Sequence, residues 1–206
     1  DQGRVRSHAA TVERDAALGR IASEAERMSG LVEDMLLLAR LDAGRPLDVE
    51  PVELPIVVTE ALMDAQAAAP DHSWHLDLVG TSASDDPPAF TVLANEDRLR
   101  QVVGNLLTNA RVHTPAGTSV RVRIEEGEGT VVLTVDDDGP GIPAEQLDHI
   151  FDRFSRGDAS RRRASGTSGL GLPIVAAIVD AFGGQIKVAA DNGTTFTVTL
   201  PAADQR

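Results

Sequence analysis

Apolar residues in the first part of the chain recur at alternating steps of three and four positions, as they do along one face of an α-helix. This seam consists of Leu18, Ile21, Ala25, Met28, Val32, Met35 and Ala39, and Leu31, Leu36 and Leu38 widen it. So wide an apolar face must be covered by other helices, in this chain or in a second copy. We expect a helix that begins by about Arg14 and stops near Gly44, with Pro46 beyond it. An oligomerising helix is favoured over the alternative, a helix that lies on the main domain.

Beyond Gly44 the chain mixes alternating and helical patterns. Strands are predicted at 47–53, 75–79, 90–93, 120–124, 130–135, 185–189 and 195–200, and helices at 55–69, 95–111 and 172–182. A polar loop is expected at 81–88. Strands 120–124 and 130–135 flank a glycine-containing turn and predict a hairpin, and Asn95 can cap the helix that follows it. Together these elements predict an α+β fold, with a mixed sheet and helices on one face.

Composition narrows the function classes. With 206 residues and 42% hydrophobic content, the chain can form one large domain or a domain with an appendage. The net charge of -13 argues against a general nucleic-acid binder. Because cysteine is absent, a metal site would need oxygen or imidazole ligands. The chain has no apolar run of membrane-spanning length and no signal peptide, so we expect it to be soluble, and its first residue, Asp1, suggests an excised fragment.

Three short motifs carry candidate chemistry. Asn105 and Asn109 stand four residues apart, so both amides project from the same side of their predicted helix. VDDDGPGIP, residues 135–143, places three carboxylates before two glycines, and those carboxylates would repel phosphate. GTSGLGL, residues 166–172, leads into the last helix, whose free N–H groups and positive dipole end can receive phosphate. Taken singly, the asparagines could be surface residues and the glycine-rich stretch a flexible loop with a cap.

In order and spacing, the asparagine pair, VDDDGPGIP, IFDRF and GTSGLGL resemble the N, G1, F and G2 boxes of sensor histidine kinases. These kinases belong to the ATPase superfamily that includes gyrase, heat-shock chaperones and MutL. The resemblance covers about 47–201, and the preceding segment resembles the second helix of the family's dimerisation hairpin. It implies a two-layer α/β sandwich of the Bergerat type at 46–206, after a partial dimerisation segment at 1–45.

The resemblance also assigns roles at the two ends of a nucleotide. Asp137 would accept a hydrogen bond from the exocyclic amine of adenine, an amine that guanine replaces with a carbonyl. Asp136 and Asp138 are expected to be solvated or to form the turn. Asn109 would offer its oxygen to Mg2+ that also bridges phosphate oxygens, with Asn105 beside it as a catalytic residue. The further nucleotide-binding positions are Arg111, His113, Gly139, Gly141, Ile142, Arg156, Gly169, Leu170, Gly171, Leu172 and Thr195.

Two features depart from the family pattern or leave room for alternatives. Many members carry a basic residue where this chain has Val112, and its neighbours Arg111 and His113 are the candidate substitutes. The segment between Phe154 and Gly169 resembles the family's ATP lid. Its arginines, Arg156, Arg161, Arg162 and Arg163, could equally belong to a solvated basic loop.

The phosphoacceptor is missing from the expected pattern. Ser7 and His8 copy only the first two letters of the family's histidine box, and too little chain follows for the first hairpin helix. We therefore expect His8 to lie in a loop or at a helix start. This fragment should bind Mg-ATP without autophosphorylating alone. His72 and His75 lack the carboxylate partners of a convincing metal site, and His149 is expected at the surface.

The main hypothesis is therefore the catalytic core of a sensor histidine kinase. It would transfer the γ-phosphoryl group of ATP to a histidine on the dimerisation domain, for relay to an aspartate of a response regulator. Its other partner would be a second copy of the chain, and no nucleic-acid partner is expected. Any membrane contact would come from segments outside this chain. The chain would then be the cytoplasmic portion of a membrane sensor. One alternative is an ATP-hydrolysing gate, disfavoured because such relatives carry a glutamate at the position of Asn105. A non-catalytic interaction module is the other.

Overall fold

The computed structural model describes residues 2–80, 90–153 and 169–203. Its contacts divide the chain into two compact units, one ending at Arg40 and one beginning at Leu41. Each unit is described by itself below.

The first unit is almost entirely the long helix α1, Gln2–Asp42. The expected end is confirmed, because Gly44 adopts a φ of 66° and donates its backbone N–H to the Leu41 carbonyl at 2.9 Å. The helix begins at Gln2, well before the expected limit of about Arg14, so the loop or helix-start position expected for His8 is wrong. No proline or glycine lies between residues 4 and 18 to interrupt the helix, so it continues back to Gln2 and includes His8.

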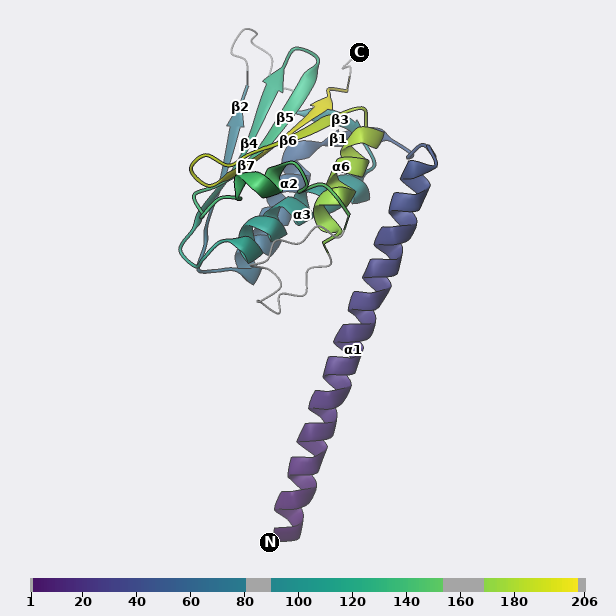
Figure 1. Ribbon diagram of the computed structural model, residues 1–206, viewed down its shortest axis with the longest axis vertical. Helices are drawn as coiled ribbons and strands as arrows, with labels where there is room; N and C mark the ends of the chain where they lie inside the picture. Colours follow the sequence, from purple (N-terminus) through teal and green to yellow (C-terminus); the bar gives the residue numbers. More distant parts are fainter. Residues whose placement is uncertain (1, 81–89, 154–168, 204–206) are drawn as a thin grey trace. The chain divides into compact units, whose positions relative to one another are not determined.

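The second unit is built on a five-stranded mixed sheet with the order β2-β4-β5-β7-β6 (Figure 1). Its strands are β2 (Ser73–Val79), β4 (Ser119–Gly127), β5 (Thr130–Asp137), β6 (Gln185–Ala189) and β7 (Thr194–Pro201). Only β2 and β4 are parallel, and β4 and β5 form the predicted hairpin. A separate antiparallel pair joins β1 (Glu50–Glu53) to β3 (Thr91–Ala94). The strand expected to begin at residue 47 thus begins three residues later.

Three helices pack on one face of the five-stranded sheet (Figure 1). They are α2 (Leu54–Ala68), α3 (Glu96–His113) and α6 (Gly171–Ala181), and a single turn, α4 (Ala144–Leu147), follows the hairpin. The predicted two-layer arrangement is therefore confirmed. Its core holds the apolar faces of α3 and α6 and the inward side chains of β4, β5 and β7, all of which are buried.

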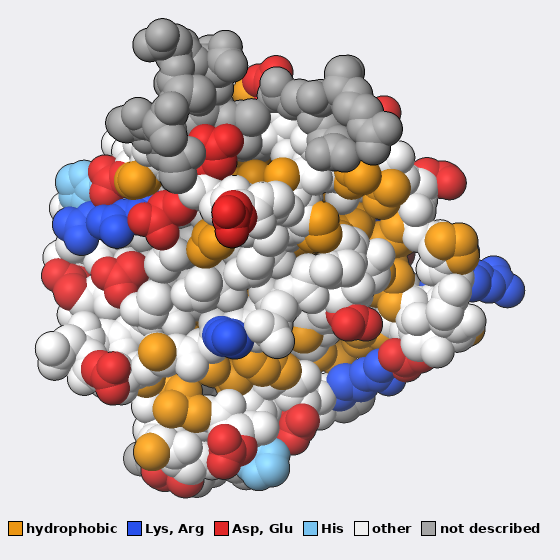
Figure 2. Space-filling view, turned by 90° about the horizontal axis from the view of Figure 1, so that it is seen from above, with side chains coloured by type: hydrophobic (Ala, Val, Ile, Leu, Met, Phe, Trp, Pro, Cys, Tyr) orange, Lys and Arg blue, Asp and Glu red, His pale blue; other side chains and the backbone are white. Residues whose placement is uncertain are grey.

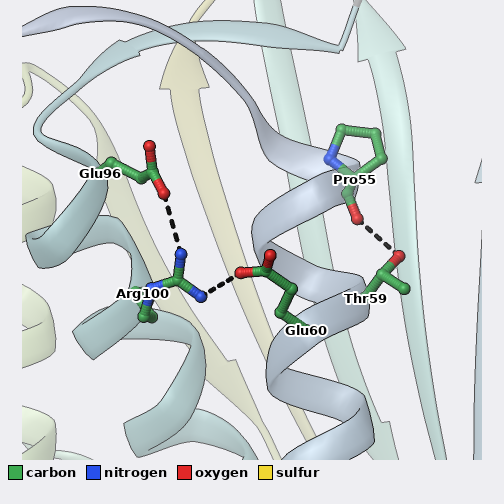
Figure 3. Close-up of polar contacts among 5 residues, drawn as sticks. All are labelled: Pro55, Thr59, Glu60, Glu96 and Arg100. Carbon is green, nitrogen blue, oxygen red and sulfur yellow. Dashed lines mark hydrogen bonds and ion pairs between the residues drawn. The ribbon is translucent and has the colours of Figure 1, made fainter.

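Polar contacts at the surface fix the start of α3. Asn95 caps the helix as predicted, and its side chain accepts the backbone N–H of Arg98 at 3.1 Å. One turn further on, Arg100 bonds Glu96 of its own helix at 2.8 Å and Glu60 of α2 (Figure 3). These bonds attach the N-terminal part of α3 to α2. The two asparagines of the first motif lie further along α3.

Candidate nucleotide-binding site

Helix α3 carries both asparagines of the predicted pair, and each is half-buried. The amide nitrogen of Asn105 donates to the carbonyl oxygen of Gly171, the first residue of α6, at 3.3 Å. A Cβ on Gly171 would lie 3.6 Å from the Asn105 amide oxygen. The structure thus brings the asparagine motif and the end of the glycine-rich motif together, although they are 66 residues apart.

Asp137 ends strand β5 and is a buried carboxylate, with 4% of its surface exposed. Its Oδ1 accepts the backbone N–H of Gly139 at 3.0 Å, and Thr194 donates from both its backbone and its hydroxyl. Burial raises the pKa of the Asp137 carboxyl above its ordinary value of 3.8, the neighbouring Asp136 adds to the rise, and the hydrogen bonds oppose it. A buried acceptor of this kind suits a ligand that presents an N–H group.

Glycines allow the chain to close tightly around Asp137. A Cβ on Gly139 would lie 2.6 Å from Thr114 Cγ2 and 2.7 Å from Asp137 Oδ1. A Cβ on Gly193 would lie 1.7 Å from the Asp137 carbonyl oxygen, and its φ of 115° excludes most other residues. Gly141, with a φ of 72°, also lies against Gly193. The acidic motif is therefore packed against the chain that leads into β7.

The placement of Thr195 contradicts its prediction as a nucleotide-binding residue. Thr194 pairs with Asp137 across β5 and β7 and is buried with it, whereas Thr195 pairs with Asp136 on the opposite face of the sheet. The Thr195 hydroxyl donates to Asp136 Oδ1 at 2.6 Å, and Asp136 is half-buried within β5 rather than part of the turn. Successive strand residues point to opposite faces, so Thr194 is the threonine beside Asp137. The sequence held a signal for this assignment, because Thr194 lies two residues before the apolar Phe196 and therefore shares its inward face of the strand.

Asp138 occupies the turn as expected and is exposed. Its Oδ1 accepts the backbone N–H of Ser119 at 2.7 Å, and its own N–H donates to the Ser119 carbonyl at 3.2 Å. This reciprocal pair attaches the turn after β5 to the segment that follows α3.

The glycine-rich motif is described from Gly169 onward. Gly169 has a φ of 70°, and Gly171 opens α6. Leu170 is fully buried, while Leu172 is half-buried. The start of α6 beside Asn105 therefore offers a helix N-terminus, the feature that suits phosphate oxygens.

The remaining predicted positions fall into two groups. Arg111 is half-buried and His113 exposed in the last turn of α3, and Ile142 is half-buried after Gly141. Arg156, Phe154 and the other arginines of the expected lid lie outside the described residues. His149 is at the surface as expected, with its Nδ1 2.8 Å from Asp152 Oδ2.

Helix α3 sets the spacing between the two ends of this site. The 137–139 turn contacts Thr114 just past the end of α3, and the start of α6 contacts Asn105 nine residues earlier. At 1.5 Å per residue, the two contacts are separated by about 13 Å along the helix axis. A ligand that uses both ends must be extended, with an N–H donor at one end and acidic oxygens at the other.

Charge is dispersed rather than gathered over the described surface. Figure 2 shows acidic side chains scattered over one face and basic side chains in small separate groups. Within the described part of the chain, no group of three or more histidines, aspartates or glutamates could hold a metal ion by itself. None of the described helices combines the length and apolar content that a bilayer crossing requires.

Known proteins resemble this chain in both sequence and structure. Residues 94–204 match the family described as histidine kinase-, DNA gyrase B- and HSP90-like ATPase. The probable sensor histidine kinase TcrY of Mycobacterium tuberculosis is 51% identical over 187 residues, which are 90% of this chain and 38% of TcrY. The mycobacterial sensor histidine kinase MprB matches with a TM-score of 0.64 at 29% identity, over 74% of this chain and 97% of that one.

A solved structure with a bound nucleotide analogue is also similar. Full-length ShkA in complex with AMPPNP matches with a TM-score of 0.66 at 28% identity, over 84% of this chain and 35% of that one. The chain spans well under half the length of TcrY and of ShkA. The family match nevertheless covers more than half of the chain, in the unit that holds the site. The chain therefore belongs to the histidine kinase-, DNA gyrase B- and HSP90-like ATPase family and contains the ATP-binding catalytic domain of a sensor histidine kinase.

Proposed function

We propose that the domain binds Mg-ATP along α3, with adenine at Asp137 and the phosphates at the start of α6. The observation that carries this proposal is a pair of contacts nine residues apart, one from Thr114, just past the end of α3, to the 137–139 turn and one from Asn105 of α3 to Gly171. The buried Asp137 carboxylate would accept the adenine amine, and a guanine carbonyl in its place would face an acceptor and weaken binding.

Magnesium fits the donor groups at the phosphate end. Asn109 supplies an amide oxygen, and Asn105 uses its amide nitrogen on Gly171 and keeps its oxygen for the site. The described residues offer no all-protein cage, which suits an ion that takes much of its coordination from substrate phosphate and water. Bound there, magnesium would neutralise phosphate charge, and Asn109 is the residue that would hold it.

We further propose that the protein transfers the γ-phosphoryl group of ATP to a histidine of its dimerisation domain, and that a response-regulator aspartate receives it next. In this reaction the domain positions the nucleotide and balances its charge, with little covalent work of its own. Asn105 occupies the position where hydrolysing relatives are expected to carry a glutamate, and it is engaged with Gly171. Because an amide cannot take a proton from water as a carboxylate can, an asparagine at this position favours transfer over hydrolysis as the main activity.

The segment before the domain is proposed to be half of a dimerisation hairpin. Large apolar side chains of α1 are more than half exposed at four seam positions, Leu18, Ile21, Met28 and Val32. Such a stripe fits a second helix in a bundle. We assign residues 1–45 to this partial dimerisation segment and 46–206 to the catalytic domain, with the phosphoacceptor helix outside this chain.

The test supplies a separate hairpin that bears an intact histidine box, together with γ-labelled ATP. Acid-labile label on the hairpin is expected, and Asn109→Ala should reduce it at least tenfold. Thr108→Ala, an exposed neighbour on α3, serves as the matched control and should leave labelling unchanged. Release of free phosphate with no label on the hairpin would instead support the hydrolysing alternative.

A further inference from the structure

The turn after β5 packs against a second segment, residues 114–119, which connects α3 to the start of β4. Asp138 and Ser119 exchange two hydrogen bonds across the two segments, and the Thr114 methyl group faces Gly139. These contacts attach the 114–119 segment to the 137–139 turn, next to Asp137 at the end of β5.

The 114–119 segment is itself held by the connection between α2 and β2. Gly117 donates its N–H to the Asp71 carbonyl at 2.8 Å, and Ser73 donates to the Thr118 carbonyl at 3.0 Å. The side-chain link is made by His72, whose Nε2 lies 3.0 Å from Thr114 Oγ1. A residue of the α2–β2 connection therefore contacts the same threonine that packs against the turn.

The hydrogen bonds of Thr114 fix the direction of this link. The Thr114 hydroxyl lies 2.7 Å from the Ala110 carbonyl, an acceptor only, so its single proton is donated there. The oxygen must then accept from His72, which requires the proton on Nε2. His72 Nδ1 is buried and has no hydrogen-bond partner among the described residues, so the ring's polar anchoring rests on Nε2. Trp74 stacks on the ring, with centroids 5.8 Å apart.

We infer that His72 is a positioning residue for the adenine end of the nucleotide site. With its oxygen held by both Ala110 and His72, Thr114 is locked in one χ1 rotamer, which points its methyl group at Gly139. Loss of the His72 bond frees that rotamer and loosens the turn that orients Asp137. His72 itself contacts no nucleotide, and the inference rests on the function proposed above.

The test compares two substitutions of His72 by amide side chains of different length, His72→Gln and His72→Asn. The Nε2 of Gln reaches the place of the imidazole Nε2 and keeps the donor, whereas Asn is too short to reach it. His72→Asn should weaken binding of a non-hydrolysable ATP analogue about fivefold, the effect of losing one buried hydrogen bond. Because the loss falls on adenine recognition, the affinity for a GTP analogue should change less. The ratio of the affinities for the ATP and GTP analogues should therefore decrease. His72→Gln should restore both.

Controls separate positioning from general damage to the fold. His75→Asn alters an exposed histidine three residues further along the chain, in β2, and should bind as the wild type does. Thr114→Val keeps the methyl group but loses the hydroxyl, so it should narrow the preference as His72→Asn does, and the double variant should add nothing further. In the wild type, nitrogen NMR should show His72 protonated at Nε2, with Nδ1 bare.

The outcomes distinguish this inference from the proposed function. Wild-type protein that binds no adenine nucleotide overturns the proposed function and this inference with it. If the wild type binds and His72→Asn binds equally well, the inference alone is overturned. Equal losses for the ATP and GTP analogues, in a variant that melts well above the assay temperature, also overturn it, since they indicate a change that is not confined to the adenine end.

Discussion

At the scale of single residues, Asp137 combines a structural cost with the proposed role in binding adenine. Its carboxylate is 4% exposed, and burial is the largest cause of its raised pKa. Ionising this carboxyl in the interior therefore costs free energy, which the hydrogen bonds from Gly139 and Thr194 partly offset. We attribute the retention of a buried carboxyl at this position to the proposed recognition of an N–H donor rather than to stability.

The pH dependence of the free energy of unfolding tests the cost of burying the Asp137 carboxyl. A carboxyl whose folded pKa is raised stabilises the fold most below its ordinary value of 3.8, and this stabilisation is lost as the pH rises through the folded pKa. Asp137→Asn cannot ionise. Its free energy of unfolding relative to wild type should therefore increase from acid to neutral pH, as measured by denaturant titration. A difference that stays flat or falls over that range would contradict the assignment.

Gly193→Ala is expected to be strongly destabilising. The added Cβ would overlap the Asp137 carbonyl oxygen at 1.7 Å, and the φ of 115° is unfavourable for alanine. We expect a loss of at least about 2 kcal/mol in thermal or chemical unfolding. Gly104→Ala is the matched control, because it lies within α3 and its Cβ would meet nothing within 4 Å. That change should stabilise the domain by about 0.5 to 1 kcal/mol, and a similar loss in both variants would refute the steric argument.

At the scale of elements, α1 and α3 have different roles. α3 is amphipathic, with one side buried in the core and the two asparagines half-buried at its edge. α1 instead leaves large apolar side chains exposed along one stripe, including Ile21 at 65% and Met28 at 58%. α3 is thus packed within the domain itself, whereas the apolar stripe of α1 is exposed and fits the proposed dimerisation segment.

Charges placed on the α1 stripe should prevent self-association. In Ile21→Glu with Met28→Glu, two carboxylates replace apolar side chains that a second helix would cover. Light scattering should show a dimer for the wild-type chain and a monomer for this variant. Ser23→Glu with Gly30→Glu adds the same charge on the opposite side of the helix and should leave the dimer intact. A monomeric wild type over micromolar concentrations would favour the alternative of a helix that does not oligomerise.

At the scale of the whole molecule, the site is assembled from segments that are distant along the chain. Thr114, just past the end of α3, contacts the 137–139 turn, and Asn105 of α3 contacts the start of α6. β7 supplies Thr194, and Gly193 just before it packs on Asp137. A ligand that spans both ends would connect these segments and should therefore stabilise the domain as a unit.

Saturation with a non-hydrolysable Mg-ATP analogue should raise the melting temperature. Ligand at about 100 times its dissociation constant adds roughly 2.7 kcal/mol, which corresponds to about 5 to 10 °C for a domain of this size. Asp137→Ala should abolish the shift, and chelation of magnesium should reduce it. An equal shift in the variant would mean that the adenine end has been misplaced.

The sequence alone was sufficient to predict the element types, the two-layer class and the family. Helix and strand periodicity, the Asn95 cap and the glycine stop near Gly44 are local signals, so each could be recognised within a short window. For α1 the pattern predicted only a latest start, about Arg14, because no strong local signal marks its first residue, Gln2. The order of the four motifs identified the family, since ordered motifs carry information that single motifs lack.

Only the tertiary structure decided which side chains meet. Thr194 rather than Thr195 lies beside Asp137 because β5 and β7 pair in that register, and a shift of one residue would exchange the faces. The bond from Asn105 to Gly171 and the link from His72 to Thr114 join residues that are 66 and 42 positions apart. Local sequence patterns fix the conformation of a segment, but the neighbour of a side chain depends on how whole elements pack.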